Sequence, residues 1–473
     1  MLSRWILIDE LFMTSAQLLA DIDRSLRGAT QTASVYKKDK SGNARSFGGL
    51  NVLAVGDMYQ LDPPEGLPLY TIPTTINALH NNQATSPSAE HGLHIMWGKT
   101  DLSFQGVTEL SIPYRCRDIW YNEVLDQIRT LELSDDNHAF LHGNETTVPG
   151  SWVQGRPNCG NAKCTTLVDQ WKDLAQKRIP WKTRQAMECE ICAQERKSKR
   201  RVLTTEEFQQ TFAQKSMINV ICAVPNNDVR YEINKHRATL FAQLNNKQLL
   251  WCPAKDKVSL DALRDDPSLP SRKLEWLQRH DRQSGDLMGM LPLVLGLRVM
   301  LTDHIDRAKH LFRGRTGTIA SWQLHDNDAK KQTAGPTYIL QSIPQIVFVI
   351  FDNADWTLDG STIPGLYPIC PTSRNWYLDQ ARKYPKLRIT RSQLPLAPAY
   401  AFSIHSLQGD NPEMLAADCC ISETTSRQTC YVALSRAKLR ESIFLMRPFP
   451  QEMFKRNPPL GPPLLLRQLK GPV

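Results

Sequence analysis

The stretch WILIDE, residues 5–10, has the composition of a buried β-strand that ends in two acidic residues. Four apolar residues lead directly to Asp9 and Glu10, and a strand of this kind presents carboxylates at the carboxyl edge of a sheet. In proteins that hydrolyse nucleoside triphosphates, a glycine-rich loop holds the phosphates and carboxylates further along the chain hold Mg²⁺. The pattern alone leaves two interpretations open, because an apolar run followed by acids can also simply end a strand.

A second apolar run, LNVLAVGD at 50–57, also ends in an acid, Asp57. Between the two runs, apolar residues from 18 to 26 recur at helical spacing, so the order strand, helix, strand is predicted. Runs that are apolar throughout suit a parallel sheet with helices on both faces, and ligands of such sheets bind beyond the carboxyl ends of the strands. We therefore expect Asp9, Glu10 and Asp57 to lie together.

The composition is that of a globular, moderately basic protein. The chain has 473 residues, 41% of them hydrophobic, and a net charge of +9. Much of that charge is concentrated in residues 170–201, which contain ten Lys/Arg against four Asp/Glu. Eleven cysteines without a signal sequence favour a reducing compartment. The longest uncharged apolar stretch, 287–297, is about half the length of a membrane span, so no membrane insertion is expected.

Three further residues could contact a nucleotide. Gln60 follows Asp57 closely and could orient a water or sense a phosphate, although Asp57 could also simply cap a turn. Arg115 lies between an expected strand at 107–115 and a helix, and Arg436 lies near the end of a helical stretch. Either arginine could stabilise charge on a transferring phosphoryl group. Alternatively, Arg115 could pair with a nearby acid, and Arg436 could act as a helix-terminal cation.

Taken together, the order and spacing of five segments resemble the superfamily 1 DNA helicases, in the branch of the petite-integration-frequency helicases and Helitron-type transposons. The resemblance extends over nearly the whole chain and rests on ILIDE, GGLNVLAVGDMYQL, YR at 114–115, LPLAPAYAFSIHSLQG and YVALSRAK. It implies an α/β fold with two RecA-like parallel-sheet motor lobes, the first of them incomplete, a small SH3-like β-barrel insertion and a zinc-ribbon-like insertion.

The resemblance also implies roles for individual residues. Asp9 would hold Mg²⁺ through water, Glu10 would polarise the attacking water, Gln60 would sense the γ-phosphate, and Arg115 and Arg436 would contact the phosphates. Residues that would couple the nucleotide to DNA or bind DNA are Asp57, Ser403, His405, Ser406, Gln408, Gly409 and Tyr431. Ser403 and Ser406 stand where the family has Thr and Lys, so a weaker coupling or DNA contact is expected there.

No G-x-x-x-x-G-K-[ST] phosphate loop occurs in the 473 residues. We therefore expect a truncated motor with little or no ATPase activity of its own. The expected domains are a first-lobe remnant (1–110), the second lobe (111–150, 202–290 and 391–450), a cysteine-rich basic insertion (151–201), a barrel insertion (291–390) and a proline-rich tail (451–473). The last residues of the tail are expected to be extended or disordered.

Four cysteines within the basic insertion have nearly the spacing of a zinc ribbon. Cys159 and Cys164 are separated by four residues, Cys189 and Cys192 by two. A structural Zn²⁺ is expected, with four free thiols as the alternative. The run RKSKRR at 196–201, with nearby tryptophans, suits nucleic acid, but it could also be a nuclear localisation signal or a solvated charge cluster.

The sequence thus predicts an ATP-dependent, Mg²⁺-requiring DNA helicase of 5′ to 3′ polarity. It would act on single-stranded or forked DNA in repair, recombination, telomere maintenance or transposition, in the nucleus or another reducing compartment. The alternative is a non-catalytic DNA-binding or partner-binding fragment, and a third possibility is a decayed element without a role. Nothing in the sequence indicates the oligomeric state.

Overall fold

The computed structural model of the chain describes most of its length but not the cysteine-rich insertion. The described residues are 5–30, 38, 42, 45–75, 86–100, 102–110, 113–116, 118–141, 220–331, 335–407, 411–421, 427–439, 442–455 and 459–471. They form two compact units. Unit 1 takes its described residues from 5–141, 419–439 and 447–471, and unit 2 from 220–418 and 442–446.

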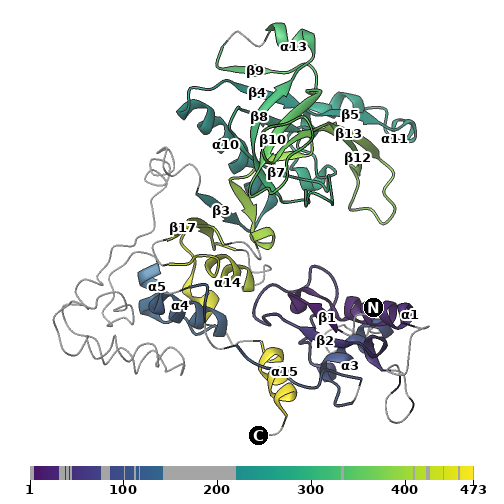
Figure 1. Cartoon of the computed structure of the whole chain (residues 1–473), viewed down its shortest axis with the longest axis vertical. Helices are drawn as coiled ribbons and strands as arrows, with labels where there is room; N and C mark the ends of the chain where they lie inside the picture. Colours follow the sequence, from purple (N-terminus) through teal and green to yellow (C-terminus); the bar gives the residue numbers. More distant parts are fainter. Residues whose placement is uncertain are drawn as a thin grey trace, which may run out of the picture. The chain divides into compact units, whose positions relative to one another are not determined.

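Unit 1 begins with the expected strand, helix and strand (Figure 1). Strand β1 (Trp5–Ile8) pairs in parallel with β2 (Asn51–Ala54), and Ile8 lies opposite Ala54. Helix α1 (Ala16–Ala29) begins where the Ser15 hydroxyl accepts a hydrogen bond from the Leu18 amide, as an N-cap does. The prediction for this segment is confirmed, although Leu18 itself lies on the exposed side of the helix.

The core of unit 1 lies on one side of the β1–β2 pair. Helix α3 (Pro87–Trp97) and the 3-10 turns η1 (Leu11–Met13) and η3 (Ser46–Gly49) pack with α1 there. The other side of the pair is apolar and exposed, with Trp5, Leu7 and Leu53 at 63%, 66% and 55% exposure. A parallel strand pair is normally covered on both faces, so this open face is unusual.

The remaining elements of unit 1 are helical. They are η4 (Pro73–Thr75), α4 (Ile119–Thr130), α5 (Asp135–Leu141), α14 (Gln428–Leu434), η9 (Gln451–Phe454) and α15 (Gly461–Lys470). Helix α4 begins at the N-cap Asp118, buries Val124 and Ile128 as expected from their spacing, and ends at Leu131 in the left-handed conformation. The Tyr121 hydroxyl donates to the Leu434 carbonyl at 2.9 Å, which joins α4 to α14.

The expectation of an extended tail is wrong, because 461–470 form helix α15. Its two prolines occupy the first turn, where a missing N–H and a fixed φ cost the helix little. Leu465 is fully buried in the core of unit 1, and the Gln468 side chain donates to the Trp97 carbonyl of α3 at 3.2 Å. The apolar residues of the tail therefore pack rather than remain in solvent.

Unit 2 contains a sheet of order β15-β3-β16-β17. Strands β15 (Ala401–Ser403) and β16 (Leu415–Asp418) both run parallel to β3 (Ile221–Val224), and β17 (Ile443–Arg447) lies beyond β16. The long helix α10 (Asn227–Leu244) follows β3 and packs on it and on β15. Two parallel-sheet regions in an α/β chain are thus confirmed.

Three more sheets make up the rest of unit 2. The largest has the order β11-β10-β8-β7-β14 and is antiparallel. Its strands are β7 (Arg298–Leu301), β8 (Thr316–Gln323), β10 (Ile346–Phe351), β11 (Leu366–Ile369) and β14 (Leu396–Pro398). The short β-branched runs RTGTIASW and QIVFVIFD predict strands of the barrel insertion, and they pair as β8 and β10, while a closed barrel stays a prediction.

The two smaller sheets have the orders β12-β13-β5 and β6-β4-β9. Their strands are β4 (Leu249–Pro253), β5 (Lys255–Val258), β6 (Met290–Leu293), β9 (Thr337–Ile339), β12 (Thr372–Tyr377) and β13 (Arg388–Gln393). Short helical segments accompany them: α11 (Leu260–Asp265), η5 (Leu269–Arg272), α12 (Lys273–Trp276), η6 (Asp281–Gln283), α13 (Asp326–Lys331) and η7 (Ile404–Leu407).

Two local expectations are wrong. The described residues of 107–115 form no strand, because three polar residues and a proline separate the apolar ones. The polar composition of 324–336 predicts a loop, but the stretch contains α13, which the Asp328 carboxylate anchors by accepting the Gln341 and Ser342 amides at 2.9 Å each. In the described part of the chain, no helix is both long and apolar enough to span a bilayer.

Candidate functional site

The carboxyl ends of β1 and β2 meet, which places Asp9 and Glu10 beside Gly56 and Asp57. The Val55 amide donates to the Ile8 carbonyl at 2.8 Å, and the Leu11 amide donates to the Val55 carbonyl at the same distance. The approach at Gly56 is close, since a Cβ there would lie 3.0 Å from the Leu11 amide nitrogen. The two acidic segments therefore share one edge, as the sequence predicts.

Glu10 adopts a left-handed backbone conformation, with φ of 51° and ψ of 44°. Its amide donates to Asp9 Oδ1 at 2.9 Å, and the residue precedes the turn η1. A side chain with a Cβ occupies this region at a cost of about 1–2 kcal/mol, and such strain concentrates at functional sites. The strained backbone fixes the direction in which the Glu10 carboxylate leaves the strand.

Asp57 connects the strand end to two distant helices. Its Oδ1 atom accepts from Arg129 Nη2 of α4 at 3.0 Å, and its Oδ2 atom accepts from the Tyr431 hydroxyl of α14 at 3.3 Å. The Arg129 guanidinium also lies over the Tyr59 ring, 4.6 Å from its centroid. We call Asp57, Tyr59, Arg129 and Tyr431 the Asp57 cluster.

The Asp57 cluster is partly removed from water, and its pKa values reflect this. Burial raises the pKa of Tyr431, and the negative charge of Asp57 raises it further. Burial alone would lower the pKa of Arg129, but Asp57 and Tyr431 outweigh it and raise this pKa. Burial also raises the pKa of Tyr59, so both tyrosines and the arginine keep their protons at neutral pH.

A second contact joins α14 to the loop after β2. Gln428 Nε2 lies 3.1 Å from the Tyr70 hydroxyl and 3.4 Å from Asp62 Oδ1, and Tyr70 donates to the same Asp62 oxygen. Burial raises the pKa of Asp62, although these hydrogen bonds oppose the shift. Helix α14 thus meets the Asp57–Asp62 loop through two of its residues, Gln428 and Tyr431, which are three residues apart in sequence.

The other residues expected at the nucleotide lie as follows. Gln60 is half-buried in the same loop, and its amide donates to the Asp57 carbonyl at 3.2 Å. Arg436 is buried just beyond α14, where its Nε donates to the Val432 carbonyl and its Nη2 to Ser435 Oγ, both at 3.1 Å. Arg115 is exposed, and no ion pair of it is found with another described residue.

The expected coupling residues of unit 2 follow strand β15. Ser403 Oγ and Ser406 Oγ lie 2.9 Å apart, and Ser406 Oγ also donates to the Ser403 carbonyl at 2.8 Å. Partial burial lowers the pKa of the His405 imidazole, so His405 is neutral at physiological pH. Gln408 and Gly409 lie outside the described residues.

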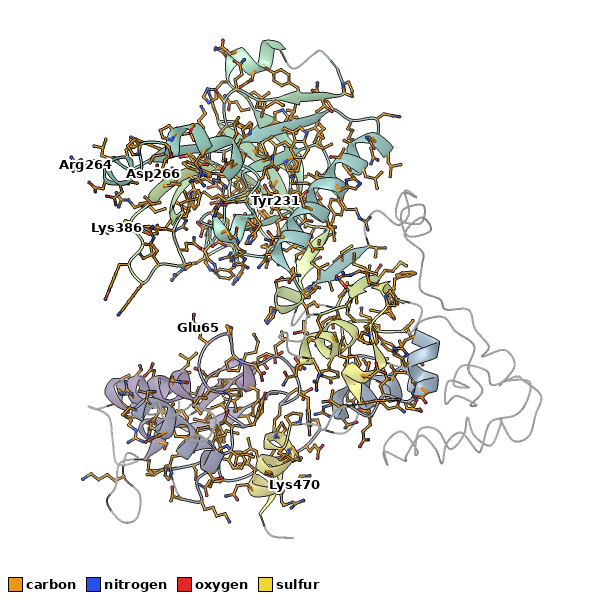
Figure 2. The ribbon with its side chains drawn as sticks, turned by 180° about the vertical axis from the view of Figure 1, so that it is seen from behind. Glu65, Tyr231, Arg264, Asp266, Lys386 and Lys470 are labelled. Atoms are coloured by element: carbon orange, nitrogen blue, oxygen red, sulfur yellow. The ribbon has the colours of Figure 1, made fainter. Side chains whose placement is uncertain are left out.

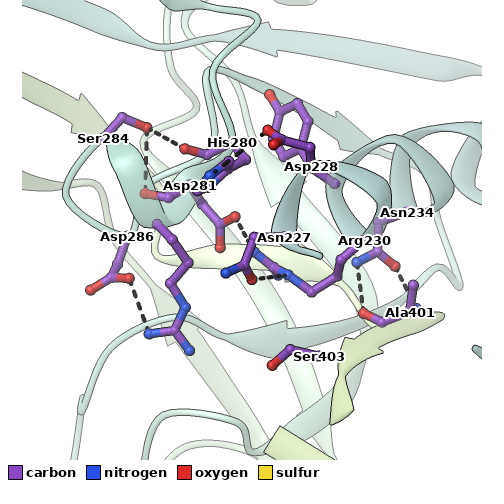
Figure 3. A network of polar contacts seen from close by, with 12 residues as sticks. Asn227, Asp228, Arg230, Asn234, His280, Asp281, Ser284, Asp286, Ala401 and Ser403 are labelled. Carbon is purple, nitrogen blue, oxygen red and sulfur yellow. Dashed lines mark hydrogen bonds and ion pairs between the residues drawn. The ribbon is translucent and has the colours of Figure 1, made fainter. Parts of the chain in front are cut away.

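Asn234 of α10 forms hydrogen bonds with the edge of β15 that does not pair with β3 (Figure 3). Its Oδ1 atom accepts from the Tyr400 and Ala401 amides at 3.0 and 2.8 Å, and its Nδ2 atom donates to the Ala401 carbonyl at 2.9 Å. The carboxamide thus replaces the neighbouring strand that the sheet edge lacks, two residues before Ser403. In the same view Arg230, one turn earlier on α10, pairs with Asp281.

Arg129 and Asn234 were not identified from the sequence. Each is a polar residue on the side of its helix that packs against the rest of the unit. A polar residue among the apolar positions of such a helix face is the sequence signal that could have indicated them. Their partners, Asp57 and Ala401, are 72 and 167 residues away, so the pairing depends on the tertiary structure.

The chain contains one Gly-Lys-Thr and four cysteines with nearly the spacing of a zinc ribbon. The only Gly-Lys-Thr of the chain, at 98–100, follows the C-terminus of α3, whereas a phosphate loop precedes the N-terminus of a helix. The four cysteines expected to bind zinc, Cys159, Cys164, Cys189 and Cys192, lie outside the described residues. Within the described ranges, no three His, Cys, Asp or Glu side chains are grouped as a metal site would require.

Comparison with known proteins gives a consistent result at the level of the fold. No protein-family model and no curated protein matches the sequence. Solved structures do match. A structure of two coordinating Pif1 helicases at forked double-stranded DNA superposes with a TM-score of 0.50 and 16% identity, covering 95% of this chain and 70% of that one.

Two further matches agree with the first. Pif1 helicase from Bacteroides, in complex with ADP-AlF3 and single-stranded DNA, gives a TM-score of 0.50 with 16% identity and covers 95% of this chain and 72% of its own. Pif1 helicase from Candida albicans gives 0.51 with 16% identity, covering 95% and 73%. The resemblance to superfamily 1 helicases is thus confirmed for the architecture, and the chain has the fold of the Pif1 helicases.

Proposed function

We propose that this chain carries the motor of an ATP-dependent DNA helicase. The observation that carries the proposal is the meeting of three segments far apart in sequence: Asp9 and Glu10 after β1, Asp57 after β2, and Tyr431 of α14. These segments are the ones that resemble the helicase motifs, and the fold is that of the Pif1 helicases. Two of the matched structures concern forked double-stranded DNA and single-stranded DNA, which supports DNA as the partner of this chain.

The side chains at the strand ends fit a magnesium nucleotide chemically. Mg²⁺ prefers carboxylate oxygens and retains several waters, so one or two carboxylates suffice beside substrate phosphates. Bound there with ATP, Mg²⁺ would neutralise charge on the phosphates. Asp9 would hold the ion through water, Glu10 would polarise the attacking water, and Gln60 would sense the γ-phosphate.

The arginines and the β15 segment would complete the motor. Arg115 and Arg436 would contact the phosphates, and Arg436 would first have to release Val432 and Ser435. Ser403, His405 and Ser406, with Gln408 and Gly409, would connect the nucleotide state to single-stranded DNA. We propose 5′ to 3′ movement, and action in repair, recombination, telomere maintenance or transposition within the nucleus, on the resemblance alone.

The absence of a G-x-x-x-x-G-K-[ST] loop from these residues favours a second candidate function. Without the loop's amides and lysine, a triphosphate would lose most of its contacts, so we propose that this polypeptide alone turns over little ATP. It would then act as a DNA-binding or partner-binding protein. The basic insertion, with a Zn²⁺ held by Cys159, Cys164, Cys189 and Cys192, would contribute to that binding.

An ATPase assay with and without single-stranded DNA separates the two functions. DNA-stimulated turnover that Glu10→Gln abolishes would support the motor, with Glu65→Gln, an exposed glutamate of the same unit, as the matched control (Figure 2). DNA binding without turnover would support the binding protein. A wild-type chain that neither binds DNA nor hydrolyses ATP would contradict both functions.

A further inference from the structure

The sheet β12-β13-β5 of unit 2 has one face packed on helices and one face open to solvent. Residues of β13 alternate strictly, so that Ile389, Arg391 and Gln393 are buried while Arg388, Thr390 and Ser392 face outward. On the inner side, α11 and α12 cover the sheet through an apolar cluster that includes Ala262, Trp276, Trp376 and Ile389.

A buried ion pair fixes the register of this sheet. Arg391 is fully buried and forms two parallel hydrogen bonds to Asp256 of β5, with Nε–Oδ1 at 2.8 Å and Nη2–Oδ2 at 2.7 Å. Its Nη1 donates to Ser284 Oγ at 2.8 Å, and its Nη2 donates also to the Trp276 carbonyl at 2.9 Å. Because every part of this guanidinium is satisfied, the outward side chains of the sheet have a defined arrangement.

The outward face contains hydroxyls, an amide and cations, and no carboxylate. The rows across the strands follow from the register and are Ser373–Ser392–Lys255, Asn375–Thr390–Lys257 and Tyr377–Arg388. Two side-chain hydrogen bonds confirm that these residues share the face: Ser373 Oγ to Ser392 Oγ at 2.7 Å and Thr390 Oγ1 to Asn375 Oδ1 at 2.8 Å. Lys255, Lys257 and Arg388 are exposed there.

The turn that joins β12 to β13 extends the same chemistry. Arg382, Lys383, Tyr384 and Lys386 are exposed, Tyr384 to 74%, and Lys383 Nζ lies 5.5 Å from the Tyr384 ring centroid. Lys386 is at the periphery of the unit in Figure 2. The one acid of the turn, Asp379, accepts the Lys386 and Leu387 amides at 3.1 and 3.0 Å, so its carboxylate holds the turn in shape.

The cations of this face differ from many others of unit 2 in lacking carboxylate partners. Elsewhere in the unit, arginines pair with acids, as in Arg264–Asp261, Arg272–Glu275, Arg298–Asp352 and Arg313–Asp286. Among the described residues, Lys255, Lys257, Lys383, Lys386 and Arg388 form no such pair, and only Arg382 does, with Asp379 at 3.5 Å. Like charges held together on a rigid face repel each other unless a polyanion binds.

We propose that this basic sheet face, made of Lys255, Lys257, Arg382, Lys383, Tyr384, Lys386 and Arg388, binds the backbone of single-stranded nucleic acid. The cations would contact successive phosphates, the hydroxyls of β12 and β13 would donate to phosphate oxygens, and Tyr384 would stack on an unpaired base. The exposed aromatic ring favours a single strand over a duplex, because bases within a duplex are already stacked. The inference rests on the proposed DNA function and names a surface for it.

The test is fluorescence anisotropy of a labelled oligo-dT with the full chain across a range of salt concentrations. Replacing Lys255, Lys257 and Arg388 together with Gln removes three phosphate contacts, so the slope of log K against log salt should fall by roughly 2, at about 0.7 per contact. Affinity at about 0.1 M salt should weaken between tenfold and 100-fold. Tyr384→Ala should weaken single-strand binding about 5- to 150-fold without changing the slope, and Tyr384→Phe should restore it.

The matched control removes three cations from the opposite side of the same sheet. Arg264, Arg272 and Lys273 belong to the helical segments that cover the inner face, and their triple replacement by Gln changes the net charge equally. This variant should bind oligo-dT within about twofold of the wild type, since non-contacting charges act only through a screened field.

Each outcome decides a different point. Wild-type binding that the basic-face triple variant retains in full would overturn the assignment of this face while leaving the DNA function intact. A triple variant that loses duplex and single-strand affinity equally, with Tyr384→Ala silent in both, would overturn the single-strand assignment. A wild-type chain that binds neither DNA form at about 50 mM salt would overturn the proposed DNA function itself.

Discussion

Removing the carboxylate of Asp57 should uncouple the strand end from helices α4 and α14. Asp57→Asn eliminates the ion pair with Arg129, whose donor and acceptor atoms are 3.0 Å apart, and weakens the acceptor for Tyr431. A hydrogen bond between charged groups contributes about 1.5–3 kcal/mol when buried. The two side chains remain 24% and 21% exposed, so solvent screening should reduce the coupling to about 1–1.5 kcal/mol.

A double-mutant cycle measures this coupling directly. Asp57→Asn, Arg129→Gln and the double variant are unfolded in urea as full chains, and the free energies of unfolding are compared. The control cycle, Asp21→Asn with Arg24→Gln, tests a pair on α1 that is more than half exposed and should give less than about 0.5 kcal/mol. A coupling at Asp57 no larger than that of the control pair would refute the reasoning.

Three further variants test other parts of the structure. Leu465→Ala should lower the free energy of unfolding by about 2–5 kcal/mol, because removal of the fully buried side chain leaves a cavity. Leu464 is partly exposed, so Leu464→Ala should lower it by less than about 1 kcal/mol. Equal effects of the two variants in urea unfolding would contradict the packing of α15 on unit 1. Glu10→Gly should be more stable than Glu10→Ala by about 1 kcal/mol, because glycine adopts the left-handed conformation without the steric cost of a Cβ. A more stable Ala variant would argue against this backbone conformation. Burial raises the pKa of Asp62, so the folded state binds a proton that the unfolded state has already lost. The free energy of unfolding of the wild type should therefore fall relative to that of Asp62→Asn as pH rises from about 4 through the raised pKa. A difference of the opposite sign in urea unfolding would be inconsistent with the buried carboxylate.

The strands and helices that could be predicted are those with strong local patterns. WILIDE and NVLA are apolar runs, and the spacing after Ser15 marks a helix with its cap, so the shared edge of Asp9, Glu10 and Asp57 followed from the sequence. The helix in the tail could not be predicted, because a proline-rich stretch suggests an extended chain. In the first turn of α15, however, prolines are compatible with a helix. Local composition could not indicate that Leu465 has a core to pack against.

The contacts that organise the candidate site were beyond sequence reasoning for a physical reason. Arg129 and Asn234 act through partners that only the folded chain brings near, and a single polar residue on a helix has the same local signature whether it is buried or solvated. Arg436 was recognised by its motif, but its hydrogen bonds to Val432 and Ser435 could not be inferred, because they depend on how the chain turns after α14.

The uncovered side of the β1–β2 pair has a practical consequence for anyone purifying this polypeptide. Trp5, Leu7 and Leu53 form a small exposed apolar patch next to a strand edge that can pair with another strand. Such surfaces promote self-association as the protein concentration rises. Sulfate salts would tighten that clustering and mild detergent would dissolve it, opposite to the response of complexes held by charge. The acidic end of β1 therefore lies next to this exposed apolar surface, so a molecule bound to the surface would limit how freely the carboxylates meet solvent.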